Sequence, residues 1–141
     1  MTLDTKIIEI INRLSVFRGN VDINLDDALQ FMRTQNARFL REHCFAYFDP
    51  PYYVKGKGLY MNYYNDQDHL DIYNAITQIE NQKWIVTYDK VDFIRDLYMN
   101  YHMFEYSLNY SAATVGKGKE YMILSDNCIL PPDSPIKLSN I

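Results

Sequence analysis

The sequence predicts an α/β fold built on a partly parallel sheet, and three observations indicate it. The short apolar runs Cys44–Phe48 and Trp84–Tyr88 have the length and composition of buried strands. An amphipathic stretch separates them, so that strand, helix and strand alternate along the chain. Two further strands, Met103–Tyr110 and Glu120–Ser125, follow as a predicted hairpin. The 141 residues are nearly half hydrophobic and suffice for one globular domain.

The amino-terminal segment is predicted to form two helices. Residues 4–17 are amphipathic, with Asp4 in the first turn and Arg18-Gly19-Asn20 as the stop. The apolar positions with helical spacing are Ile7, Ile10, Ile11, Leu14 and Phe17. Residues 21–23 read as a short edge strand, and Asn24 as the N-cap of the second helix. The apolar stripe of that helix is predicted to contain Leu25, Ala28, Leu29 and Met32.

Capping residues and turn residues predict the remaining elements. Asp66 or Asp68 is expected to cap the helix between the first two strands, with Ile72, Ala75, Ile76 and Ile79 facing inward. Asp89 is expected to cap a short helix that uses Val91, Ile94, Leu97 and Tyr98. Residues 52–64 and 111–119 are predicted loops. The proline-containing tail, residues 131–141, is predicted to be irregular.

Charge and cysteine content limit the possible functions. The formal net charge of −4 argues against broad electrostatic attraction to nucleic acid, so any DNA contact would depend on local basic clusters or on a partner. Cys44 and Cys128 lack metal-type spacing and indicate a reduced, cytoplasmic setting. No signal peptide or bilayer-spanning apolar run is seen. Thirteen tyrosines suit base stacking and sheet propensity equally.

The most informative stretch is the end of the first strand. Pro50 and Pro51 follow Asp49 directly, and prolines cannot donate hydrogen bonds to a sheet, so strand pairing must end there. Asp49 is therefore predicted at the carboxyl end of a central strand, where open α/β sheets bind their ligands.

Asp49-Pro50-Pro51-Tyr52 resembles the catalytic motif of AdoMet-dependent DNA adenine-N6 methyltransferases. The match to the Dam-like, D12 class of bacterial and phage enzymes continues downstream with Lys55-Gly56, Leu59-Tyr60, Asp68-His69 and Trp84–Asp89. It covers about residues 21–130. The resemblance implies the second half of a Rossmann-like methyltransferase sheet, in which the last strand inserts antiparallel beside its neighbour.

The resemblance also implies roles for individual residues. Asp49 and Pro50 would accept the two N–H bonds of the adenine amine and line the AdoMet site, and Pro51 would keep the turn rigid. Tyr52 would stack on a base flipped out of double-stranded DNA, and Tyr53 would either assist or only pack. No metal is implied, because the sulfonium methyl group is already activated. Further DNA contacts are expected from Lys55, Asn109, Tyr110 and Lys117.

Structural explanations compete with several of these roles. The motif alone is compatible with a tight turn after a strand, and methyltransferases of proteins and RNA use Asn-Pro-Pro-Tyr instead. Asn109 and Tyr110 suit hairpin structure as well as a base pocket. His69 is expected to cap or pack, and Trp84 is expected in the core.

The chain departs from the family pattern in one important respect. Nothing in residues 1–43 resembles the aromatic-x-Gly-x-Gly loop that holds AdoMet in the family. The sequence therefore predicts the carboxyl-terminal half of a methyltransferase, with residues 1–20 as a remnant of the target-recognition region. Two hypotheses follow. One is an enzyme half that needs a complementary half, binds AdoMet weakly alone and otherwise self-associates. The other is a non-catalytic module that binds nucleic acid or protein.

Overall fold

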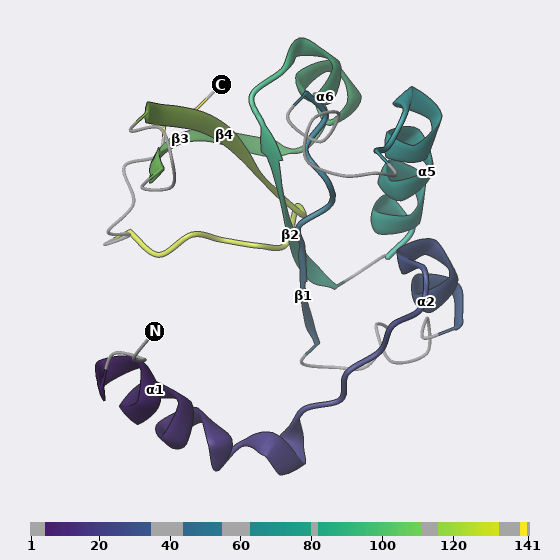
Figure 1. Ribbon diagram of the computed structural model, residues 1–141. Coiled ribbons are helices and arrows are strands. Elements are labelled where there is room, and N and C mark those ends of the chain that lie inside the picture. Colours follow the sequence, from purple (N-terminus) through teal and green to yellow (C-terminus); the bar gives the residue numbers. More distant parts are fainter. Residues whose placement is uncertain are drawn as a thin grey trace.

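The predicted alternation of strands and helices is confirmed (Figure 1). The computed structural model describes residues 5–34, 44–54, 63–79, 82–110, 116–132 and 139–140. Its elements are α1 (Thr5–Ser15), a 3-10 turn (Arg18–Asn20), α2 (Ala28–Thr34), β1 (Phe45–Phe48), α5 (Asp66–Thr77), β2 (Lys83–Asp89), α6 (Asp92–Leu97), β3 (His102–Tyr110), β4 (Gly116–Leu124) and β5 (Ser139–Asn140).

The strands form one mixed sheet of five strands in the order β1-β2-β4-β3-β5. β1 runs parallel to β2, and β4 inserts antiparallel between β2 and β3. The prediction of a mixed α/β sheet with an antiparallel hairpin is thus confirmed. The register places Asp89 of β2 opposite Glu120 of β4, which in turn lies opposite Tyr106 of β3. Directly paired residues share a face of the sheet, so these three side chains are neighbours.

Helices α2, α5 and α6 lie together on one face of this sheet (Figure 1). The core forms there, because Ile72 and Ile76 of α5 and Ile94 of α6 are buried against the strands. The strands contribute mainly Ala46, Trp84, Val86, Tyr88, Tyr121 and Ile123. Trp84 is therefore a core residue, as predicted.

The run Cys44–Phe48 was predicted to be a buried, central strand, but β1 is buried on one face only. Its burial alternates, with Ala46 buried while Phe45 and Tyr47 are 54% and 58% exposed. Among the described residues no helix packs on the face that carries Phe45 and Tyr47, so the apolar run in the sequence does not correspond to two-sided burial. β1 also lies at the edge of the sheet, with β2 as its one partner strand in the described part of the chain.

Two predicted helix caps are displaced. Asn65, rather than Asp66 or Asp68, caps α5, and Asp68 completes a capping box by accepting the Asn65 N–H. Asn65 is preferred because its short side chain reaches the backbone N–H groups of Gln67 and Asp68. Asp89 does not cap α6, since Val91 occupies the N-cap position without a side-chain hydrogen bond.

The amino-terminal prediction holds for the helices but not for the strand. α1 forms, and none of its residues is buried. Residues 21–23 are not a strand, because Val21 and Ile23 are exposed and have no strand to pair with in the described chain. Asn24 accepts from Asp26 N in a local turn, whereas Asp27 accepts from Gln30 N and so caps α2. Leu25 is 97% exposed and lies outside the apolar stripe, which keeps Leu29 and Met32.

The hairpin and the tail also differ from expectation. β4 begins at Gly116, so the connection after β3 is shorter than the predicted 111–119, and Lys119 lies in a strand. β5 pairs with Phe104 and Glu105 of β3, so the tail is not wholly irregular. The predicted loop 52–64 lies largely outside the described residues. No helix in the described segments is long and apolar enough to cross a bilayer.

Candidate active site

Asp49 is the first residue after β1 and lies at the carboxyl end of the strand, as predicted. Its side chain is exposed, and its Oδ1 accepts a hydrogen bond from Thr87 Oγ1 at 3.1 Å. Thr87 has only one hydroxyl proton, so Tyr47 O–H must be the donor in the 2.9 Å contact between Tyr47 and Thr87. The resulting chain, from Tyr47 to Thr87 to Asp49, fixes the direction of the carboxylate. No described residue donates to Asp49 Oδ2.

Asp89 holds the polypeptide immediately after the motif. Its Oδ1 accepts from Tyr53 N at 2.8 Å, and its Oδ2 accepts from Val54 N at 2.9 Å. Asp89 is 5% exposed, and a buried carboxylate requires such donors to offset its lost hydration. The last residue of β2 therefore anchors the turn that follows β1, which explains why Asp89 is not available to cap α6.

Tyr52 is half-buried and donates its hydroxyl to Glu120 Oε1 at 2.8 Å. Tyr106 donates to the other oxygen of the same carboxylate, Oε2, at 2.6 Å. Burial and this bond to Glu120 raise the pKa of Tyr106 well above its usual range, so Tyr106 remains a protonated donor. The hydroxyl of Tyr52 is therefore attached to β4, a strand in the middle of the sheet.

Tyr53 faces the helices instead. Its ring stacks on Phe93 with centroids 4.9 Å apart and lies 5.2 Å from the His69 ring. Its hydroxyl donates to Asp66, and that bond raises the pKa of Tyr53. This geometry gives Tyr53 a packing role. Its predicted contact with a base stays a prediction.

His69 is fully buried and its Nδ1 lies 3.2 Å from the Tyr88 hydroxyl. Burial raises the pKa of Tyr88 beyond its usual range, so this hydroxyl keeps its proton. Aromatic rings of Tyr53, Tyr64 and Tyr88 surround the imidazole. The packing role expected for His69 is therefore observed.

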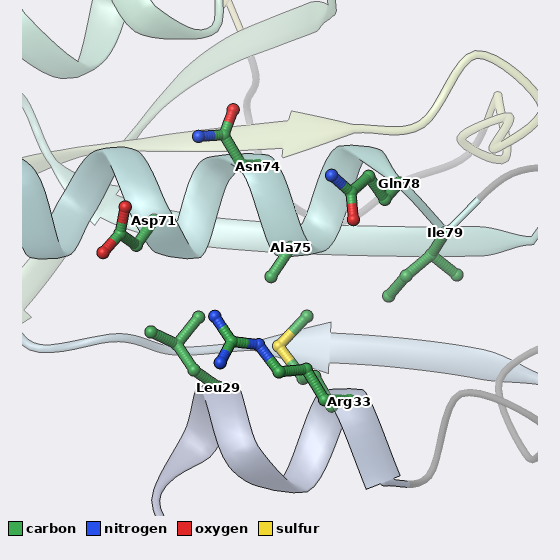
Figure 2. Close-up of a pocket in the computed structure, with 8 residues that line it drawn as sticks. Leu29, Arg33, Asp71, Asn74, Ala75, Gln78 and Ile79 are labelled. Atoms are coloured by element: carbon green, nitrogen blue, oxygen red, sulfur yellow. The ribbon is translucent and has the colours of Figure 1, made fainter.

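Two of the cavities formed by the described residues are bordered by α2. One, of about 220 Å³, is bordered by Asp49, Pro50 and Pro51 together with Met32 and Ile72. The other, of about 300 Å³, lies between α2 and α5. Figure 2 shows Leu29 and Arg33 of α2 facing α5 across the second cavity, with Ala75 pointing toward α2. None of the motif residues borders it, so the smaller cavity is the one relevant to Asp49.

The remaining predicted contacts are only partly described. Lys55 lies outside the described residues. Asn109 pairs with Lys117, and Tyr110 follows in β3, but the side chains of these three residues are not described. The Asn109–Lys117 pair lies three pairs beyond the Tyr106–Glu120 pair, and Tyr110 lies one pair further, past the carboxyl end of β2. The topology thus brings them to the same end of the sheet as Asp49.

Thr87 and Glu120 contact the motif and Asp89 contacts the turn after it, and these contacts were not predicted from the sequence. A signal was present for two of them, because Asp89 and Glu120 are charged residues that adjoin apolar strand residues. Thr87 gives no such signal, since threonine is common in strands. Their partners are 35 to 68 positions away, which local pattern reading does not connect.

Fold and site together are compatible with part of a methyltransferase fold, with Asp-Pro-Pro-Tyr following a strand at its carboxyl end. The family model of the D12 class N6 adenine-specific DNA methyltransferases matches residues 8–112. The chain belongs to this family. The match includes most of α1 and the whole motif, and it ends before β4. A search of curated proteins found no match to the chain.

Proposed function

We propose that this chain is the catalytic half of a site-specific DNA adenine-N6 methyltransferase that uses AdoMet as methyl donor. The observation that carries the proposal is the geometry of Asp49. It follows a parallel strand, is exposed, and has one oxygen held by Thr87 while the other receives no hydrogen bond from the described residues.

The chemistry requires hydrogen-bond acceptors more than a strong base. The lone pair of the adenine amine is delocalised into the ring, which makes the nitrogen a poor nucleophile. Acceptors for both N–H bonds favour a pyramidal nitrogen with a localised lone pair. Asp49 Oδ2 would accept one N–H and the Pro50 carbonyl the other. The Pro50-Pro51 pair and the Thr87 bond orient these acceptors before the substrate binds.

Tyr52 would provide the stacking surface for the flipped base. It belongs to the same tetrapeptide as Asp49, and its hydroxyl is anchored by Glu120. Double-stranded DNA is accordingly the proposed substrate. Lys55, Asn109, Tyr110 and Lys117 remain candidates for contacts around it, at the same end of the sheet. Tyr53 would act by holding the turn against α5 and α6.

The described residues form only part of a site for AdoMet, which supplies an activated methyl group when bound. The cavity beside Asp49 and Pro50 has a volume of about 220 Å³, below the roughly 300–1,000 Å³ of most small-molecule sites. β1, which leads directly into the motif, is an edge strand whose own side chains Phe45 and Tyr47 are exposed. A complementary half that pairs with this edge would supply the glycine loop and complete the site. A second copy of the chain is the partner expected when no such half is present.

The alternative function is a non-catalytic module that binds nucleic acid or protein through the same surface. The exposed aromatic face of β1 favours binding without distinguishing the partner. Methyl transfer distinguishes the two functions, because a binding module has no requirement for Asp49 as an acceptor.

The proposal is tested by co-expressing the chain with an amino-terminal half of a Dam-like enzyme that carries the glycine loop. Transfer of labelled methyl from AdoMet to duplex DNA is then measured for wild type, Asp49→Ala and Asp92→Ala. Asp92 is an exposed carboxylate on α6 and serves as the matched control. We expect loss of transfer only in Asp49→Ala, with an unchanged thermal midpoint because the Asp49 side chain is exposed. Transfer that persists in Asp49→Ala would contradict the mechanism.

A further inference from the structure

Glu120 is a buried carboxylate in the middle of the sheet and outside the residues matched by the family model. It is 3% exposed and lies on β4 between Asp89 on β2 and Tyr106 on β3. A buried carboxylate is costly unless donors surround it, and replacement by an apolar residue is often neutral for stability. A role beyond stability would account for a glutamate at this position.

The partners of Glu120 connect it to the proposed site. Tyr52 reaches Oε1 from the turn after β1, a contact between residues 68 positions apart. Tyr106 occupies Oε2 from the neighbouring strand and so fixes the carboxylate itself. Hydrogen bonds from neutral donors to a carboxylate are stronger than bonds between neutral groups, and they impose a direction.

Tyr52 is thereby held at both ends. At the backbone end, Asp89 accepts from the next two amides, Tyr53 N and Val54 N. At the hydroxyl end, Glu120 accepts the O–H. Because the backbone and the hydroxyl of Tyr52 are both fixed, the side chain has lost its rotamer freedom before a ligand binds. Stacking of a ligand on the ring therefore does not incur the entropic cost of ordering this side chain.

We propose that Glu120 is a positioning residue that orients the ring of Tyr52 for stacking on the target base. The identity of the ligand, a purine base, rests on the proposed function. The contact between Glu120 and Tyr52 does not depend on it. It assigns a site function to β4, the strand that inserts antiparallel between β2 and β3.

The contact is tested first without any ligand. 3-Fluorotyrosine is introduced at position 52 of the full chain, which places fluorine beside the hydroxyl, and the ¹⁹F chemical shift is recorded. We expect Glu120→Ala to move the signal toward that of solvent-exposed fluorotyrosine and Glu120→Gln to move it less, because the amide oxygen still accepts. Glu105→Gln is the matched control, since Glu105 lies on adjacent β3 but pairs with Lys90 and Lys119. An unchanged signal in a folded Glu120 variant would overturn the positioning role.

Base binding is tested second, with a single-stranded oligonucleotide that contains one 2-aminopurine, whose fluorescence falls on stacking. Immobilising one side chain corresponds to about a two- to tenfold change in affinity. We expect Glu120→Ala and Tyr52→Phe each to weaken binding by that factor, and the double variant to be no weaker than either. Additive losses would show that Glu120 acts independently of Tyr52 and would contradict the inference. The same titration is run with the chain co-expressed with the amino-terminal half, and absence of quenching by that wild-type complex would contradict the proposed function, while the ¹⁹F result would still decide the contact.

Discussion

Replacement of Asp89 should destabilise the chain more than its position at a strand end would suggest. Its carboxylate is 5% exposed, and each oxygen accepts one backbone N–H from the turn after the motif. In Asp89→Asn, the amide oxygen can accept only one of these bonds, and the amide NH₂ then faces the second N–H. Two donors are therefore opposed at a site that water reaches poorly.

The magnitude follows from the two bonds. A hydrogen bond to a charged group contributes about 1.5–3 kcal/mol to stability. Asp89→Asn loses one bond and weakens the other, so we expect a loss of about 2–3 kcal/mol. Asp89→Ala loses both, and we expect about 3–5 kcal/mol after allowing for water entering the vacated space. Either value is a large fraction of the roughly 5–15 kcal/mol by which domains are stable.

Urea unfolding followed by circular dichroism measures this loss. The urea midpoint should fall while the slope of the transition stays constant, which indicates a change in stability rather than in the surface exposed. Asp92→Asn is the control, because it makes the same substitution at a side chain that is 83% exposed. A midpoint for Asp89→Asn that matches this control would show that the two amides do not depend on Asp89.

Four further outcomes are expected. Tyr52→Ala should reduce methyl transfer by the complemented enzyme far more than Tyr52→Phe, since loss of an aromatic stack costs ~1–3 kcal/mol; equal losses would mean that the hydroxyl matters more than the ring. Calorimetry of the purified chain should show weak or no AdoMet binding, and tight binding would refute the partial site. Tyr98→Phe should stabilise the chain by about 1 kcal/mol, because the buried Tyr98 hydroxyl has no hydrogen-bond partner among the described residues. Burial raises the pKa of Tyr98 above the 10.0 of an ordinary tyrosine, so above pH 10 the unfolded chain loses this proton while the folded chain keeps it, and stability falls; Tyr98→Phe lacks the group and should unfold less readily in alkali. Sedimentation equilibrium of the chain alone should show a dimer or larger species, with apolar α1 residues such as Ile11 at the contact, and a compact monomer at high concentration would exclude this.

The strand and helix order could be predicted because each element has a local signal. The apolar stripe of α5 and the run Trp84–Tyr88 follow periods that burial imposes on sequence. The residues at which helices and strands begin and end were less predictable. Asn65 and Asp68 are both good capping residues, and only the backbone geometry shows that Asn65 caps while Asp68 reciprocates. The strand predicted at residues 21–23 failed because β propensity alone does not supply a partner strand.

The candidate site was predictable only at its centre. The prolines in Asp49-Pro50-Pro51-Tyr52 mark the end of a strand from sequence alone, and the structure places Asp49 at that strand's carboxyl end. The residues that hold the motif are not local to it. Thr87 and Glu120 reach the motif, and Asp89 reaches the turn after it, through the pairing of β1, β2 and β4, so their contribution depends on sheet register.

The positions of Thr87, Asp89 and Glu120 are relevant to how a methyltransferase could be divided between two chains. Asp49, the proposed acceptor, the turn after the motif and the ring of Tyr52 are each held by residues of β2 or β4. All of these supports lie within this one chain, on the side of β1 that is already paired. The cofactor wall would lie on the other side of β1, where the described structure has an open strand edge. Division at that edge would separate cofactor binding from acceptor geometry without disrupting the hydrogen bonds that hold Asp49, the turn and Tyr52. The acceptors can therefore be preorganised in this chain before a complementary half, or any methyl donor, is bound.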